Sequence, residues 1–88
     1  MEYISAYMET DKHGQVEGCI CVAEEGYGYW GFDDESGYWF EVVEEPDLIL
    51  QEAIDEQGNV VFLTDLEKEK LLWIASEIYW ERYAENNK

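Results

Sequence analysis

A chain of 88 residues with 22 acidic and five basic side chains carries a formal net charge of −17, yet 47% of its residues are apolar and 16% are aromatic. Its length corresponds to one domain, residues 1–88, and its apolar content is sufficient for a compact core despite the repulsion between like charges. The acidic excess excludes direct binding to nucleic acid or to an anionic membrane, because both ligands require clustered Lys and Arg.

The sequence also predicts where the protein resides. Its first residues, MEYISAYMETDK, lack the basic and apolar regions of a secretory signal, and no apolar run approaches the roughly 18 residues of a membrane span. Cys19 and Cys21 are too close together on a strand for an unstrained disulfide, so we expect reduced thiols. These features indicate a cytoplasmic protein.

Residues 2–24 are expected to form a first antiparallel hairpin. Apolar and polar residues alternate over 2–9 and again over 15–24, as they do in half-buried strands. The segment DKHG at 11–14 reads as the turn between them, since its glycine can adopt a positive φ. Ile4, Ala6 and Met8 are predicted to share one face of the first strand, and Val16, Ile20 and Val22 are predicted to share one face of the second.

A second hairpin is predicted from two segments rich in aromatic residues, 26–32 and 38–44, which flank the polar loop DDESG at 33–37. Three glycines within 26–32 weaken the first strand and indicate a bulge or a close backbone approach. Pro46 ends the second strand.

The segment 47–55 is compatible with two structures. Pro46 suits the first position of a helix, and Leu48, Glu52 and Asp55 have helical spacing. Against this, the turn EQGN at 56–59 and the apolar run VVFLT at 60–64 are typical of a turn and the return strand of a third hairpin. We favour a strand for 47–55.

The clearest element is a C-terminal helix over 64–85. Thr64 and Glu67 have the spacing of a capping box, and no Gly or Pro interrupts the segment. A broad apolar arc is expected to pack on the sheet, and it comprises Leu71, Leu72, Ile74, Ala75, Ile78 and Tyr79. A second stripe falls on nearly the opposite side and contains Leu66, Trp73 and Trp80. Either a curved sheet or the N-terminal hairpin covers this stripe, or it is an oligomer interface, for instance of a homodimer.

Together these elements predict an α+β fold, with an antiparallel β-sheet of about four to six strands, mostly a meander, and one C-terminal α-helix packed on it. The single domain divides into a strand-rich acidic part, 1–63, and the helix, 64–85. Charge is divided unevenly, because residues 1–67 hold 18 acids and one base whereas residues 68–88 hold four of each. The strand-rich part is therefore the anionic part of the molecule.

The segment 24–47 mixes nine carboxylates with seven aromatic rings and contains no Lys, Arg or His. We expect its rings to anchor the sheet while its acids face solvent, with carboxylates at i and i+2 about 6.6–6.8 Å apart on one face. Such a rigid negative surface competes for a groove that binds phosphates, whereas the alternative is that the acids serve solubility alone. The predicted partner-binding residues are Glu24, Glu25, Asp33, Asp34, Glu35, Glu41, Glu44, Glu45, Asp47, Glu52, Asp55 and Glu56.

In size and in its runs of acids, the chain resembles the small acidic proteins with which phages and mobile elements disarm host nucleases, namely the DNA-mimic anti-restriction and anti-CRISPR inhibitors. The resemblance lies in Glu24-Glu25, Asp33-Asp34-Glu35, Glu41, Glu44-Glu45 and Asp47. These inhibitors share no common fold, so the resemblance implies a type of partner but no residue roles. It implies a non-enzymatic viral inhibitor that binds a basic nucleic-acid-binding protein, such as a nuclease or defence complex. If a phage encodes the chain, the cytoplasm in which it acts is that of the host cell.

Other chemistry has less support in the sequence. The loop at 33–37 lacks the alternating spacing of a calcium loop, and His13 with Cys19 and Cys21 supplies three zinc ligands at unusual spacing. A single His in a turn is also poorly placed to activate a cysteine. We therefore predict no catalytic residue, no metal and no cofactor.

Three alternative functions follow from the same features. The chain is also similar in size and acidity to immunity proteins that plug basic toxin nucleases. A protein of a different class would be an acidic oligomeric module that assembles through the Trp73/Trp80 helix face. A calcium-responsive module is the third alternative.

Overall fold

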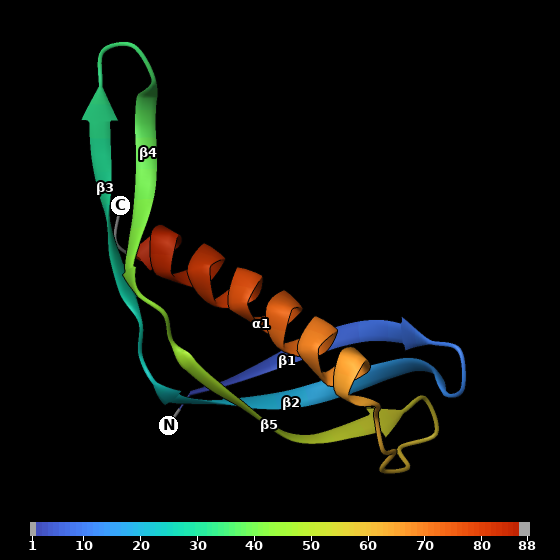
Figure 1. Cartoon of the computed structure of the whole chain (residues 1–88). Helices are drawn as coiled ribbons and strands as arrows, with labels where there is room; N and C mark the ends of the chain where they lie inside the picture. The colour runs from blue at the N-terminus through green and yellow to red at the C-terminus, as the bar shows by residue number, and fades with distance from the viewer. Residues whose placement is uncertain (1, 87–88) are drawn as a thin grey trace.

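The computed structural model describes residues 2–86 and contains five antiparallel strands and one helix (Figure 1). The predicted α+β fold, with antiparallel strands and a C-terminal helix packed on them, is confirmed. The elements are β1 (Glu2–Thr10), β2 (Gly14–Glu24), β3 (Tyr27–Asp33), β4 (Gly37–Glu44), β5 (Asp47–Asp55) and α1 (Asp65–Asn86). Within residues 2–86, no helix is both long enough and apolar enough to cross a membrane.

The body of the molecule is a three-stranded sheet in the order β1-β2-β5. The first hairpin is confirmed, with Ile4 opposite Ile20 and Thr10 opposite Gly14. The Thr10 hydroxyl closes its turn, because it accepts the His13 N–H at 2.9 Å and donates to the Gly14 carbonyl at 3.1 Å. Gly14 has a φ of 68°, as the turn prediction required.

Helix α1 covers one face of this sheet and forms the core with it. Leu71, Ala75 and Tyr79 recur every four residues and are buried, so they line one side of the helix. Gly18 lets the helix approach, since a Cβ atom there would lie 2.3 Å from Leu71 Cδ2. The buried apolar residues of the core cluster are Ile4, Ala6, Val16, Ile20, Val22, Ala53, Leu63, Leu71, Ala75 and Tyr79.

The predicted capping box begins the helix. The Thr64 N–H donates to Glu67 Oε1 at 2.9 Å, and the Glu67 N–H donates to Thr64 Oγ1 at 3.2 Å. Two backbone donors that a helix start leaves without intrahelical partners are thereby satisfied.

The segment 47–55 is a strand, as favoured, but the predicted return strand at 60–64 is wrong. This segment makes a single bridge, between Val60 and Ile54, and the Val61 N–H donates to the Ala53 carbonyl at 2.9 Å. The chain must then cross from the sheet to the helix layer, where Leu63 joins the core and Thr64 caps α1. Four residues between the turn and the cap are too few for both a paired strand and this crossing.

The strands also divide into two sheets, whereas one meander was predicted. Strands β3 and β4 pair with each other and form a ribbon that stands away from the body at an angle to α1 (Figure 1). We call residues 27–44 the arm. The chain enters and leaves the arm at one point, because a Cβ atom on Gly26 would lie 2.4 Å from the Glu44 carbonyl oxygen and 2.5 Å from Pro46 N. Strand β5 then returns to the body and takes the place beside β2.

Candidate functional site

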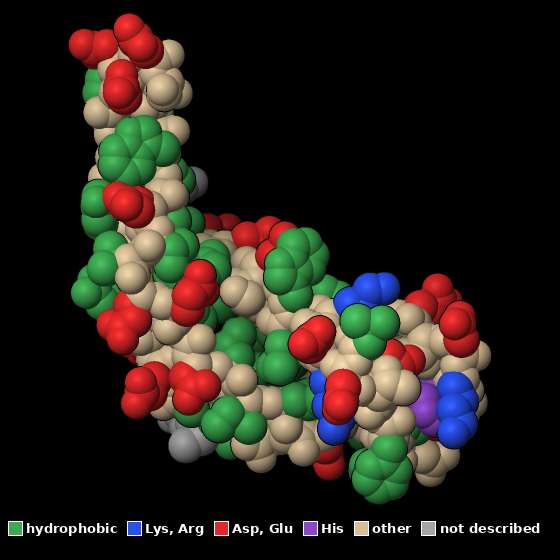
Figure 2. Space-filling model, viewed as in Figure 1, with side chains coloured by type: hydrophobic (Ala, Val, Ile, Leu, Met, Phe, Trp, Pro, Cys, Tyr) green, Lys and Arg blue, Asp and Glu red, His purple; other side chains and the backbone are tan. Residues whose placement is uncertain are grey.

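The nine acids of the segment 24–47 are all exposed, and they lie on the arm and at its base (Figure 2). Three occupy the tip, at 33–35, and Glu41 lies along β4. Five surround the base, and these are Glu24, Glu25, Glu44, Glu45 and Asp47. Within this base, Glu24 and Asp47 are directly opposite each other on neighbouring strands, so their like charges are held close.

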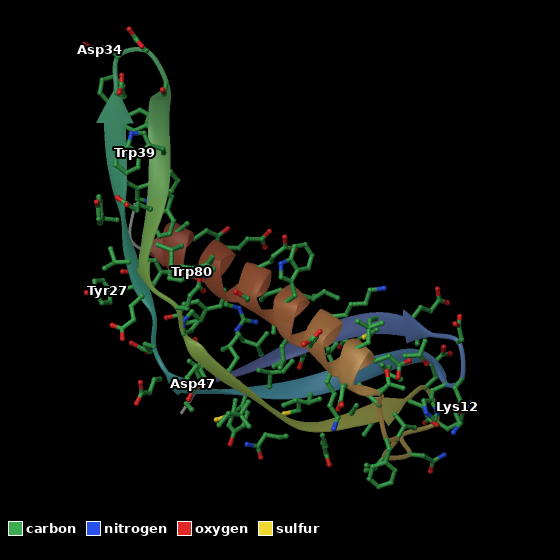
Figure 3. The ribbon with its side chains drawn as sticks, viewed as in Figure 1. Lys12, Tyr27, Asp34, Trp39, Asp47 and Trp80 are labelled. Atoms are coloured by element: carbon green, nitrogen blue, oxygen red, sulfur yellow. The ribbon has the colours of Figure 1, made fainter. Side chains whose placement is uncertain are left out.

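Lys12 and Asp34 mark the two ends of the molecule, which is 50 Å long (Figure 3). Asp34 lies at the tip of the arm, and Lys12 lies in the turn between β1 and β2 at the other end. The segment 24–47 carries a charge of −9, and the other 64 residues together carry −8. The anionic character is therefore concentrated toward one end.

Three predicted partner-binding residues are not brought to the arm. Glu52 lies opposite Cys19 in the body sheet, and Asp55 and Glu56 lie at the end of β5 near Gly14. Asp55 also has a structural role, because its Oδ1 accepts the N–H groups of Gln57 at 3.0 Å and Asn59 at 2.9 Å. The structure thus separates these acids from the other nine.

The three acids at the tip of the arm lie in a turn that one of them helps to close. Asp33 Oδ1 accepts the Glu35 N–H at 2.9 Å, and Gly37 has a φ of 77°. A carboxylate that accepts a backbone N–H two residues on is a common way to fix a turn. The Asp33 side chain is thus held by the loop's own backbone.

The rings of the arm lie in cross-strand pairs. Trp30 faces Phe40 with ring centroids 5.3 Å apart, and Phe32 faces Tyr38 at 5.0 Å. We call the side of the arm that carries these four rings the inner face. Its strand residues between positions 28 and 42 include no carboxylate. Such pairs stabilise a ribbon that has little other packing.

The expectation that these rings would anchor the sheet is wrong for most of them. Phe32 is 61% exposed and Tyr38 is 77% exposed, because the arm leaves the body and no second layer covers its outer half within residues 2–86. The opposite side, the outer face, carries Tyr29, Trp39 and Glu41. There the Tyr29 hydroxyl donates to Glu41 Oε2, and this hydrogen bond raises the pKa of Tyr29 above its ordinary value, with smaller contributions from the Glu41 charge and from burial.

Helix α1 holds the base of the arm through two tyrosines. The Tyr79 hydroxyl donates to the Gly26 carbonyl at 2.9 Å, and the Tyr83 hydroxyl donates to the Gly28 carbonyl at 3.2 Å. Burial raises the pKa of Tyr79, which keeps its hydroxyl protonated as a donor. Phe40 completes the joint, with its ring 5.6 Å from Trp80 and 5.9 Å from Tyr83.

The sequence did not predict that Tyr79 and Tyr83 anchor the base of the arm. Tyr79 was placed correctly in the buried arc, but its partner on the sheet could not be named. The sequence did contain one indication of this contact, namely the glycines at the start of the second hairpin, which predicted a bulge or a close backbone approach. Both occur, because the register shifts between Tyr27 and Gly28 and a Cβ atom on Gly28 would lie 2.4 Å from the Glu41 carbonyl oxygen.

The arm covers one end of the helix stripe that was considered as an oligomer interface, Leu66, Trp73 and Trp80. Leu66 is 69% exposed and Trp73 is 65% exposed, but Trp80 packs against Phe40 and is partly buried. Trp73 and Trp80 both line a groove in the corner between the arm and α1, whereas Leu66 does not. The three residues therefore do not form one uninterrupted exposed surface.

The sulfur and imidazole groups do not assemble into a site. Cys19 and Cys21 are free and lie opposite Ser5 and Tyr3 on the sheet. His13 is in the turn before β2, and the five residue steps from Gly14 to Cys19 span about 16 Å at the rise of a strand. Across the described part of the chain, no three His, Cys, Asp or Glu side chains converge in a way that could hold a metal ion.

Comparisons with protein-family models, with curated proteins and with solved structures gave no match to this chain.

Proposed function

We propose that this chain is a non-enzymatic binding protein that inserts its acidic arm into a basic, nucleic-acid-binding surface of a nuclease or defence effector and thereby blocks it. The observation that carries the proposal is the placement of nine exposed carboxylates, with no basic residue among them, on a projecting ribbon and its base. A projecting ribbon can enter a groove that the body of the molecule could not.

The charge density supports competition with nucleic acid. A net charge of −17 along 50 Å corresponds to about one negative charge per 3 Å. A single nucleic-acid strand has one charge per about 3.4 Å, and a duplex has one per about 1.7 Å. The protein therefore presents a charge density close to that of a single strand, and a groove that binds phosphates would attract it.

The distribution of charge supports an orientation as well. The Lys12 turn lies at the end of the molecule away from the arm, and Lys68 and Lys70 lie in the first turns of α1. A basic partner would therefore attract the arm more strongly than the opposite end, where these bases offset part of the negative charge. Long-range steering of this kind presents the arm first.

Affinity capture from a bacterial lysate at 50 mM NaCl tests the proposal when three baits are compared. One bait is the wild type, the second is D33N/D34N/E35Q at the tip, and the third is E9Q/D11N/E69Q on the body. Both variants lose three negative charges from exposed positions. We expect the wild type and the body variant to retain the same nucleic-acid-binding proteins, and the tip variant to lose them.

Two further results decide the outcome. A short DNA duplex should displace the captured proteins, and elution should occur over a narrow range of rising salt. If the tip and body variants retain partners equally, bulk charge alone is responsible and the proposal is wrong. A salt-resistant oligomer in sedimentation, without any salt-sensitive partner, would instead favour an assembly module.

A further inference from the structure

The corner between the arm and α1 forms a groove with a volume of about 430 Å³ (Figure 2). Two sides define it. The inner face of the arm supplies one wall, and one continuous face of the helix supplies the other. The side chains that matter for its chemistry are Trp30, Phe40, Trp73, Glu77, Trp80 and Glu81.

The aromatic residues of this groove are held in place but remain accessible. Trp80 packs against Phe40 at 5.6 Å and against Tyr83 at 5.3 Å, and it lines the groove where the arm meets the helix (Figure 3). Trp73 is 65% exposed and Trp30 is 40% exposed, so both side chains are accessible to a ligand. The groove thus brings three tryptophan side chains to the lining of one space.

The charge of the groove selects the kind of ligand. Glu77 and Glu81 are one helical turn apart on the groove face, and both are exposed. The lining contains no Lys or Arg. The neighbouring Arg82 is directed elsewhere, since its Nη1 donates to the Tyr3 carbonyl at 3.4 Å on β1, and Lys70 lies one turn before Trp73 without lining the groove.

We propose that this groove binds arginine side chains from a basic segment of the partner protein. Guanidinium groups stack on indole faces and also pair with carboxylates through a planar set of donors, so arginine matches both parts of the lining. Lysine matches it less well, because its ammonium is a compact and strongly hydrated charge. A second copy of this chain is a poor occupant, since each copy carries −17.

This inference rests on the proposed function in one respect, because it assumes that the partner is basic. It adds a second contact, at the corner, to the charge pairing by the arm. The acidic tip would set the rate of encounter, whereas stacking in the groove would set the rate of dissociation.

Calorimetric titration with two synthetic peptides, hexa-arginine and hexa-lysine, tests the groove at 150 mM NaCl. We expect hexa-arginine to bind the wild type about tenfold more tightly than hexa-lysine. W73A should weaken hexa-arginine binding about tenfold, and L66A is its control because Leu66 is equally exposed on the same helix. E77Q/E81Q should weaken it similarly, with E69Q/E85Q as the control of equal charge.

Three outcomes of the titration would overturn the inference. These are no binding of hexa-arginine, equal binding of the two peptides, or equal losses in the groove variants and their controls. Self-association that W73A abolishes would show that a second copy occupies the groove, and would also overturn it. Because the capture experiment varies the arm tip and this titration varies the groove, the failure of one proposal is distinguishable from the failure of the other.

Discussion

Tyr79 connects the hydrophobic core to the base of the arm. Its ring is buried with Leu71 and Ala75 on the helix side of the sheet, and its hydroxyl donates to Gly26, where the chain leaves the body. One side chain therefore contributes both to the stability of the body and to the position of the arm. The same residue titrates at alkaline pH, which makes its contribution measurable.

Replacing Tyr79 with Phe should lower the free energy of unfolding by about 1 kcal/mol at pH 8, because the hydrogen bond to Gly26 is lost. Since burial raises the folded-state pKa above the ordinary 10.0, the unfolded state releases the Tyr79 proton first. This contribution is fully present below pH 10 and is lost as the pH rises through the folded-state pKa. The advantage of the wild type over Y79F should therefore shrink between pH 8 and pH 10.5.

Urea unfolding followed by circular dichroism at both pH values measures this difference. Y38F serves as a control at pH 8, because Tyr38 is 77% exposed and the variant should stay within about 0.5 kcal/mol of the wild type. An advantage of the wild type that grows with pH would contradict the assigned protonation state.

At the scale of elements, the sequence predicted well what depends on local pattern. Alternation located the strands, and the Thr64–Glu67 spacing located the helix start, because both signals reside within a few residues. The same reasoning could not divide the strands between two sheets. That outcome depends on the backbone approach at Gly26 and on β5 pairing with β2 from more than 20 residues away.

Only part of the candidate site could be predicted, because the sequence shows local patterns and not contacts between distant segments. The acids of 24–47 were recognised from composition, and they lie on the arm and at its base. Glu52, Asp55 and Glu56 were predicted to act with them, but the direction of β5 carries these three residues toward the other end of the molecule. The groove was not predicted, because it forms from the two arm strands and a helix that lies more than 30 residues further along the sequence.

The arm should be separable from the body. Its two ends meet at Gly26 and Pro46, so replacing residues 27–44 with two glycines should close the chain without strain. We expect the shortened protein to unfold cooperatively with its helix intact, and to lose about 1–3 kcal/mol with the contacts of Phe40 and Tyr83. Urea unfolding and an amide NMR spectrum check this, with a variant trimmed only at 33–36 as the comparison. A spectrum without dispersion would mean that the arm is required for the core.

At the scale of the whole molecule, charge repulsion opposes folding and is not distributed evenly. The base of the arm holds five carboxylates, including the directly opposed pair Glu24 and Asp47, whereas the tip projects away from the body. Repulsion at the base acts on the β2–β5 pairing that folding must form. Repulsion at the tip acts mainly on the local turn.

Neutralising the base pair should therefore stabilise the protein more than neutralising two acids at the tip. We expect E24Q/D47N to raise the melting temperature by about 4–8 °C in 10 mM NaCl, equivalent to about 1 kcal/mol, and D34N/E35Q to change it by less than half as much. The gain should shrink in 0.5 M NaCl, where the screening length falls from about 30 Å to below 8 Å. Equal shifts in both variants, or a gain that salt leaves unchanged, would show that repulsion is not localised at the base. If E24Q/D47N also loses the captured partner, the destabilising acids are the ones that binding requires, which is the expected conflict between stability and function at a binding site.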